Sequence, residues 1–160
     1  GLVPEIISTG GTPNLVNLGH LKGATEHRSG TYIFNDRMMM AAGVANSNNC
    51  ALLIFSSVVS RAADTRGIID AGSKTFTSDT GGLAGFGLIL EHPKANIHQM
   101  AEEHGFLDLS DCETKPSIGD ILRVIPNHVC VVVNMFDQLV AVRENAIVDI
   151  LQVAARGRLV

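Results

Sequence analysis

The sequence predicts a mainly β fold, a β-barrel or a β-sandwich, because short strand-like runs alternate with turn residues over most of the chain. The alternation is clearest beyond residue 120, where turn-like pieces such as Pro126-Asn127 and Glu144-Asn145 separate apolar runs. These runs are Ile121–Ile125, Val129–Val133, Leu139–Val142 and Ile147–Val153. Short strands at such regular spacing are typical of a barrel or of two facing sheets.

The middle of the chain adds further expected strands, which have a strand-like, largely apolar composition. They are Thr31–Phe34, Ala51–Ser60, Arg66–Asp70 and Leu88–Leu90. Gly81-Gly82 and Gly85-Phe86-Gly87 precede the last of them and indicate loops or bulges.

The first 23 residues have a different pattern, in which a strand, a turn and a helix follow one another. Pro4–Ile7 is a short apolar run, and the small residues of Ser8–Pro13 form the turn that ends it. Leucines then recur at every third position from Leu15 to Leu21, before Gly23. This spacing predicts a short helix that stops at the glycine.

Composition bounds the class of protein. At 160 residues, with 46% hydrophobic and 18% charged residues, the chain is expected to form one domain with one core. Its net charge of −4 and its scattered Lys and Arg residues argue against a nucleic-acid partner. Apolar runs such as 50–59 are too short to cross a bilayer, and no secretory signal is visible. We therefore expect a cytoplasmic protein without a membrane partner.

The segment Pro126-Asn127-His128-Val129-Cys130 is the sharpest candidate for a metal site. If it is extended, side chains two residues apart share a face, and the His128 imidazole would lie beside the Cys130 thiol. An imidazole and a thiolate suit zinc, and two protein ligands leave positions open for water and substrate. Taken alone, such a pair is more often a partly buried histidine and a small core cysteine.

Cysteine spacing adds to this interpretation. Cys50, Cys112 and Cys130 lie far apart in the sequence, which argues against a disulfide framework. One of the three can then serve as a ligand or a nucleophile.

A second candidate site is the turn formed by Ser8, Thr9, Gly10, Gly11 and Thr12. It lies between an expected strand and an expected helix, where free backbone N–H groups and hydroxyls can bind a phosphate. The competing interpretation is an ordinary glycine turn.

Two other groups of residues are weaker candidates. Glu102-Glu103-His104-Gly105 contains potential ligands, but such a cluster is more often a solvated turn. Lys74 is the lysine that could suggest a Schiff base, yet no cationic or apolar neighbour in the sequence activates it. We do not assign Lys74 as a cofactor lysine.

Taken in order, these segments resemble one family. Ser8–Pro13 is followed by Glu26–Asp36, Asp70–Lys74 with Ser78-Asp79, Glu102–Gly105, Gly119-Asp120, Pro126–Cys130 and Ala155–Gly157. The series is similar to the C-terminal half of D-threonine aldolases and D-serine dehydratases, which are pyridoxal-phosphate enzymes with a fold like that of alanine racemase. Ser29 departs from the family pattern, where proline is more common.

The resemblance implies an architecture and two sites. Residues 1–22 would be the last segment of an N-terminal α/β barrel that carries pyridoxal phosphate, and residues 23–160 a C-terminal β-domain. Ser8–Thr12 would hold the cofactor phosphate, while His128 and Cys130 would hold zinc or manganese. The cofactor lysine would lie in a preceding part of the barrel, and the first residue, Gly1 rather than Met, fits a piece of a longer protein.

The resemblance also implies a lyase that acts on D-β-hydroxy amino acids. We expect the D-threonine aldolase type first, because the segments Asn35–Met38 and Asn134–Asp137 are closer to such sequences. The alternatives are a dehydratase of D-serine or 3-hydroxyaspartate and, in another class, a non-catalytic β-domain that binds a metal or a partner. Further expectations are a homodimer and no activity of this chain without the preceding barrel.

Overall fold

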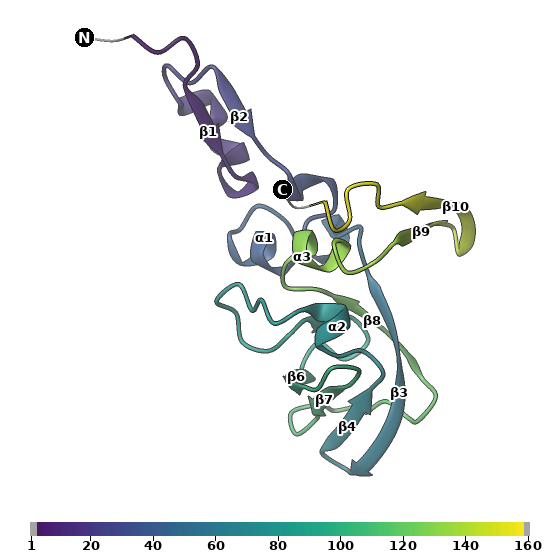
Figure 1. The fold of residues 1–160 in the computed structure, drawn as a ribbon. Coiled ribbons are helices and arrows are strands. Elements are labelled where there is room, and N and C mark those ends of the chain that lie inside the picture. Colours follow the sequence, from purple (N-terminus) through teal and green to yellow (C-terminus); the bar gives the residue numbers. More distant parts are fainter. Residues whose placement is uncertain (1–2, 159–160) are drawn as a thin grey trace.

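The centre of the molecule is a six-stranded antiparallel sheet, seen in a computed structural model that describes residues 3–158 (Figure 1). Its strands are β3 (Ile54–Ala63), β4 (Arg66–Ile69), β5 (Leu88–Ile89), β6 (Asn96–Met100), β7 (Gly105–Asp108) and β8 (Ile121–Ile125). Their order is β5-β8-β3-β4-β7-β6. The backbone N–H of Phe86 bonds to Ile97 O at 3.1 Å, which joins the β5 end of the sheet to β6. The sheet is therefore nearly closed into a barrel, as the sequence predicted.

Strand β3 holds the two halves of this sheet together. Its first part, Ile54 to Ser57, pairs with β8, and its second part, from Val58, pairs with β4. The register shifts between Val58 and Ser60, where a single strand changes its partner and bends.

The inner face of the sheet encloses the hydrophobic core. Ile69, Ile89, Ile97 and Val124 have no exposed surface, and they come from four different strands. Phe76, from the short helix α2 (Ser73–Phe76), packs into the same cluster. Burial of apolar side chains from every side of the sheet is the main force that closes it.

Helix α3 occupies a segment that the sequence predicted as a strand. Val129–Val133 is α-helical, so this prediction is wrong. The carboxylate of Asp36 accepts a hydrogen bond from the Val129 N–H, and Val129 and Val132, three positions apart, are both buried. A cap from elsewhere in the chain and a buried face at helical spacing override the β propensity of the valines.

The predicted strand Thr31–Phe34 is also wrong, because Thr31–Ile33 forms the 3₁₀ helix η2. The N–H groups of Phe34 and Asn35 both bond to Thr31 O, and Asn35 has a positive φ of 52°. Local hydrogen bonds therefore close a turn before an extended conformation can continue. Next follow helix α1 (Arg37–Ala41) and the 3₁₀ helix η3 (Ser47–Asn49).

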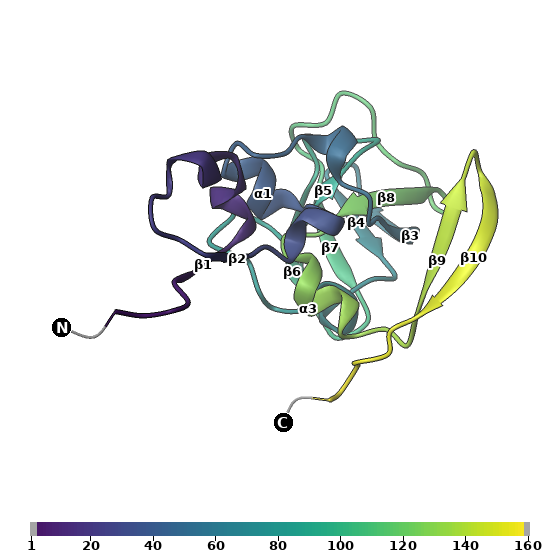
Figure 2. The same ribbon diagram turned by 90° about the horizontal axis from the view of Figure 1, so that it is seen from above.

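The N-terminal residues form a small unit beside the barrel (Figure 2). Strand β1 (Ser8–Gly10) pairs in parallel with β2 (Glu26–Arg28), and the 3₁₀ helix η1 (Thr12–His20) connects them. The helical segment was expected here, but the strand was predicted at Pro4–Ile7, which is irregular in the structure.

A hairpin of β9 (Gln138–Arg143) and β10 (Ala146–Gln152) follows α3, in agreement with the two strands expected there. Glu144 and Asn145 form its turn with positive φ values of 49° and 64°, the backbone of a type I′ turn.

Among residues 3–158, no helix has the length and apolar character that a membrane crossing needs.

A prediction concerns the link between β3 and β4. Asp70 accepts hydrogen bonds of 2.7 Å from Ser56 Oγ and from the Ser57 N–H. Burial raises the pKa of Asp70, but these hydrogen bonds lower it more, and the net pKa lies below its usual range. The ionised carboxylate therefore stabilises the fold above the unfolded pKa of about 3.9, and this stabilisation disappears as the pH falls through the lower folded value.

Asp70→Asn is accordingly expected to destabilise the protein by about 1 kcal/mol at pH 7, a value kept small because the side chain is partly exposed. Urea unfolding of both proteins at neutral and at acidic pH measures the difference. It should shrink toward zero below the folded pKa, and an equal difference at both pH values would contradict the role of the charge.

Candidate metal and phosphate sites

His128 lies at the start of helix α3, in an extended backbone conformation, with its side chain 27% exposed. Its Nδ1 lies 2.8 Å from Oδ2 of Asp79. The hydrogen bond to His128 is the largest cause that holds the pKa of Asp79 below its usual value. An ionised carboxylate only accepts hydrogen bonds, so Nδ1 carries the proton and Nε2 keeps its lone pair in the neutral ring. Histidines that bind metals through Nε2 commonly have this carboxylate partner.

Cys130 is the second residue of α3, and it is exposed, whereas Cys50 and Cys112 are buried. Burial raises the pKa of both of the latter thiols. The sulfur of Cys130 lies 3.8 Å from Thr31 Oγ1, a weak contact across 99 positions of sequence. Of the three cysteines, Cys130 is therefore the one whose thiol a metal ion from solvent can reach.

The structure thus places both predicted ligands at one end of α3, though not by alternation along a strand. Among residues 3–158, no group of three or more His, Cys, Asp or Glu side chains lies close enough to hold a metal. The donor chemistry of a neutral imidazole nitrogen and an exposed thiol still fits a zinc-type ion. Such an ion would take its remaining ligands from water, substrate or another polypeptide segment.

The predicted phosphate turn Ser8–Thr12 is in part a strand, because Ser8–Gly10 forms β1, and only Gly11 separates it from Thr12, the first residue of η1. Gly11 has a φ of 101°, a conformation that favours glycine, and its N–H bonds to Arg28 O at 3.1 Å. The Thr12 hydroxyl is buried and accepts the Tyr32 N–H. Thr9 Oγ1 lies 3.0 Å from His27 Nδ1. Several groups of the turn are therefore bonded internally.

Arg28, the last residue of β2, lies beside this segment and was not singled out in the sequence. Its guanidinium bonds to Ser8 Oγ, which also contacts Glu26. A Cβ atom at Gly10 would lie 3.1 Å from the Arg28 guanidinium, so glycine lets the cation cover the turn. A guanidinium beside small residues and hydroxyls is a suitable phosphate partner. The parallel pairing of β1 with β2, which creates this contact, is not visible in the local sequence.

Lys74 and the Glu102-Glu103-His104 cluster meet in the structure. Lys74 Nζ lies 2.7 Å from Glu103 and 3.4 Å from Glu102, and all three side chains are largely exposed. The hydrogen bond to Glu103 is the largest cause that raises the pKa of Lys74. A lysine nucleophile needs the opposite shift, so this geometry does not activate Lys74.

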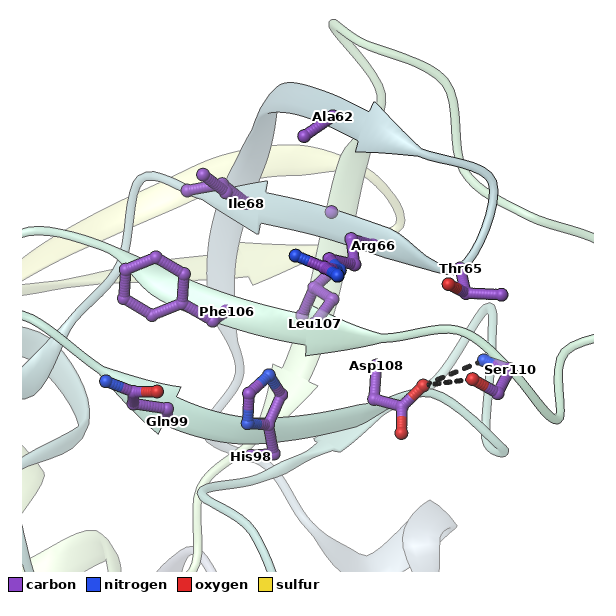
Figure 3. A pocket seen from close by; sticks show the side chains of 11 residues that line it. Ala62, Thr65, Arg66, Ile68, His98, Gln99, Phe106, Leu107, Asp108 and Ser110 are labelled. Carbon is purple, nitrogen blue, oxygen red and sulfur yellow. Dashed lines mark hydrogen bonds between the residues drawn. The ribbon is translucent and has the colours of Figure 1, made fainter.

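A hollow of about 530 Å³ lies over strands β4, β7 and β6, which are different elements from those of the His128 site (Figure 3). Arg66, His98 and Asp108 contribute polar atoms to it, and Phe106 contributes an apolar wall. The Asp108 carboxylate accepts hydrogen bonds from the N–H and the hydroxyl of Ser110 at 2.9 and 2.6 Å. No candidate from the sequence falls in this hollow.

Comparison with known proteins identifies the family. The family model described as "Putative serine dehydratase domain" matches residues 51–142, more than half of the chain. The chain belongs to this serine dehydratase domain family. A protein of Mycobacterium tuberculosis, itself uncharacterized, is 35% identical over 131 residues, which cover 79% of this chain and 98% of that protein.

Named relatives of this serine dehydratase domain are lyases. D-threonine aldolase of Arthrobacter sp. is 32% identical over 161 residues, which cover 98% of this chain and 41% of the aldolase. D-threo-3-hydroxyaspartate dehydratase of Delftia sp. is 31% identical over 147 residues, which cover 81% of this chain and 39% of the dehydratase. The chain therefore spans about two fifths of the length of these enzymes, and the family resemblance expected from the sequence is confirmed.

Solved structures agree with this assignment. A D-threo-3-hydroxyaspartate dehydratase variant superposes with a TM-score of 0.82 at 28% identity, over 95% of this chain and 43% of that one. D-threonine aldolase from Filomicrobium marinum superposes with a TM-score of 0.83 over 100% of this chain and 44% of that one. At 24% identity, the second likeness concerns the fold alone.

Proposed function

We propose that this chain is the metal-carrying β-domain of a pyridoxal-phosphate-dependent lyase that acts on D-β-hydroxy amino acids. The observation that carries the proposal is the His128–Asp79 hydrogen bond, which leaves the lone pair of Nε2 available to a metal, two positions before the exposed thiol of Cys130. The lyase names of the relatives support it. Solved forms of D-threo-3-hydroxyaspartate dehydratase also include a His→Ala variant and a metal-free Cys→Ala variant, substituted two positions apart as His128 and Cys130 are.

In this proposal each candidate residue has one task. Pyridoxal phosphate supplies an electron sink for the substrate α-carbon, and zinc or manganese supplies a Lewis acid for the substrate hydroxyl. His128 Nε2 and Cys130 Sγ hold the ion, and Asp79 fixes the ring of His128. Ser8 to Thr12, with Arg28 above them, bind the cofactor phosphate.

The domain organisation follows from the same proposal. Residues 1–22 form the last segment of the cofactor-binding barrel, and residues 23–160 form the β-domain. The pairing of β2 with β1, apart from the six-stranded sheet, supports a separate N-terminal unit, although this unit extends to Arg28 and so beyond the proposed boundary at residue 22. Exposed apolar residues of the β9–β10 hairpin, among them Val140, Ile147 and Ile150, support packing against the preceding barrel. A homodimer is likewise a proposal.

Within this class we place D-threonine aldolase activity first. The alignment with the Arthrobacter aldolase covers 98% of this chain, against 81% for the Delftia dehydratase. Aldol cleavage of D-threonine gives glycine and acetaldehyde, whereas dehydration of D-serine gives pyruvate and ammonia. Product analysis therefore separates the aldolase from the dehydratase.

Metal removal tests the proposal directly. We expect the full-length gene product to cleave or dehydrate D-threonine, D-serine or D-threo-3-hydroxyaspartate. Treatment with EDTA should lower turnover by at least about tenfold, because the Lewis acid is removed, and zinc or manganese should restore it. Aldehyde and ammonia are measured in the same samples.

Unchanged turnover after thorough metal removal would contradict the metal role. Turnover by residues 1–160 alone would contradict the requirement for a lysine outside this chain.

A second candidate function is a non-catalytic metal- or partner-binding β-domain. The Mycobacterium tuberculosis protein supports it, because 98% of that protein aligns with this chain, so the family includes proteins of little more than this domain. This candidate predicts metal binding by residues 1–160 and no lyase activity in the full-length product.

A further inference from the structure

Asp36 is the one fully buried acidic side chain among the buried polar residues of 3–158. Its Oδ1 accepts a hydrogen bond of 2.9 Å from the Met39 N–H, so it caps helix α1. Its Oδ2 accepts a bond of 3.0 Å from the Val129 N–H, 93 positions away. No Lys, Arg or His lies within salt-bridge distance of Asp36 in the described part of the chain. Burying a carboxylate without a cation nearby costs free energy, and the two hydrogen bonds offset part of that cost.

The second bond holds the segment that carries the candidate metal ligands. Val129 follows His128 directly, and the carbonyl of Asn127, on the other side of His128, accepts the Met38 N–H at 3.2 Å. One position earlier, Pro126 O accepts the Arg37 N–H at 3.1 Å. The backbone is thus fixed on both sides of His128 by the first turn of α1, next to α3 (Figure 1).

The remaining contacts complete this arrangement. The Asn127 side chain accepts a bond of 2.7 Å from the Arg37 guanidinium and donates to the carbonyls of Thr80 and Gly85 at 3.1 and 2.8 Å. Thr80 follows Asp79, the partner of the His128 ring. The loop that carries Asp79 and the backbone that carries His128 are therefore held in one network.

We propose that Asp36 is a positioning residue for the metal site, which fixes the His128 backbone so that Nδ1 of the ring meets Asp79 and Nε2 keeps its lone pair for the metal. The inference rests on the proposed function for the metal, although the orientation of the ring can be measured without one. A carboxylate suits this task because both oxygens accept, one for each helix start. The amide of Asn has one acceptor and would turn its NH₂ toward one of the two N–H groups.

Asp36→Ser separates the capping of α1, through the Met39 N–H, from the hydrogen bond to the Val129 N–H. Serine is a good helix cap and can still accept the Met39 N–H, but it is too short to reach Val129. We expect the dissociation constant for zinc or cobalt, measured on residues 1–160 by calorimetry or by thiolate-to-cobalt absorbance, to rise about tenfold or more. The ¹⁵N resonances of the His128 ring, assigned with His128→Ala, should move from the Nδ1–H tautomer toward averaged values.

Asn46→Ala is the matched control. The Asn46 side chain caps η3 through the Asn48 N–H at 2.9 Å and makes no bond to residues 126–129. Asn46→Ala removes a helix cap, as Asp36→Ser removes a hydrogen bond, so it should also lower the melting temperature. Unlike Asp36→Ser, it should change neither the metal affinity nor the resonances of the His128 ring. If Asp36→Ser does not fold, the isosteric Asp36→Asn is measured in the same way.

The outcomes separate this inference from the proposed function. Unchanged ring resonances in a folded Asp36 variant would overturn the inference, whether or not a metal binds. Displaced resonances in a protein that binds no metal through His128 would support the positioning role and count against the proposed function. Displaced resonances with weakened metal binding would support both.

Discussion

In the full-length gene product, His128→Ala is expected to lower lyase turnover by about two orders of magnitude or more. The substitution removes Nε2, one of two candidate protein ligands. A site with two protein ligands binds a metal more weakly than one with three or four, so the loss of one ligand should leave the metal largely unbound. The absorbance of bound pyridoxal phosphate should remain, because no contact in the described chain links His128 to the phosphate turn. Turnover is measured with saturating zinc or manganese and again at limiting metal.

Two further variants make this result specific. Asp79→Asn keeps the size of the partner but not its charge, and an effect of about 10- to 100-fold on metal affinity is expected. His98→Ala changes a histidine in the hollow over β4, β7 and β6, and should leave turnover as it is. Equal losses for His98→Ala and His128→Ala, or full turnover of His128→Ala, would remove the basis for the metal site.

The strands that the sequence predicted well are those whose partners are close or whose pattern is unambiguous. Strand β8 has the predicted bounds, Ile121–Ile125, because a turn marks each end. The β9–β10 hairpin follows from the Glu144-Asn145 turn between two apolar runs. Val129–Val133 was missed because a short run of valines has no periodicity of its own, and the cap that makes it helical comes from Asp36.

In the candidate site, too, residues close in sequence could be recognised from the sequence, whereas partners distant in sequence could not. His128 and Cys130 were paired as candidates because they are two positions apart, but the expected strand is a helix start, and their joint binding of a metal stays a prediction. Asp79 lies 49 positions from His128, and nothing in its own neighbourhood marks it as the partner of an imidazole. Arg28 reaches Ser8 across 20 positions through a parallel strand pair of three residues each. Local patterns identify side-chain chemistry, but the partners that orient it depend on the tertiary fold.

The largest effect on stability is expected for Gly72→Ala, which should cost about 3 kcal/mol or more. A Cβ atom at position 72 would lie 2.5 Å from Glu102 O and from His104 N, and it would also contact Ala101 O. These are backbone atoms of the β6–β7 turn, which cannot move aside as a flexible side chain can. The Ser73 N–H bonds to Ala101 O at 2.9 Å, so displacing the turn would also release the start of α2.

Thermal unfolding measures this cost, and a fall in melting temperature of about 6–12 °C corresponds to it in a domain of this size. Gly19→Ala in η1 is the matched control, because a Cβ atom at position 19 would meet no other atom within 4 Å and the φ of Gly19 is not in the left-handed range. Alanine there reduces the entropy of the unfolded chain and should change stability by less than about 1 kcal/mol, in the favourable direction. If both variants unfolded at the same temperature, the contact between Gly72 and the β6–β7 turn could not be as close as the structure shows. A selective loss for Gly72→Ala would establish that this glycine is required because the backbone of α2 approaches the turn too closely for any side chain.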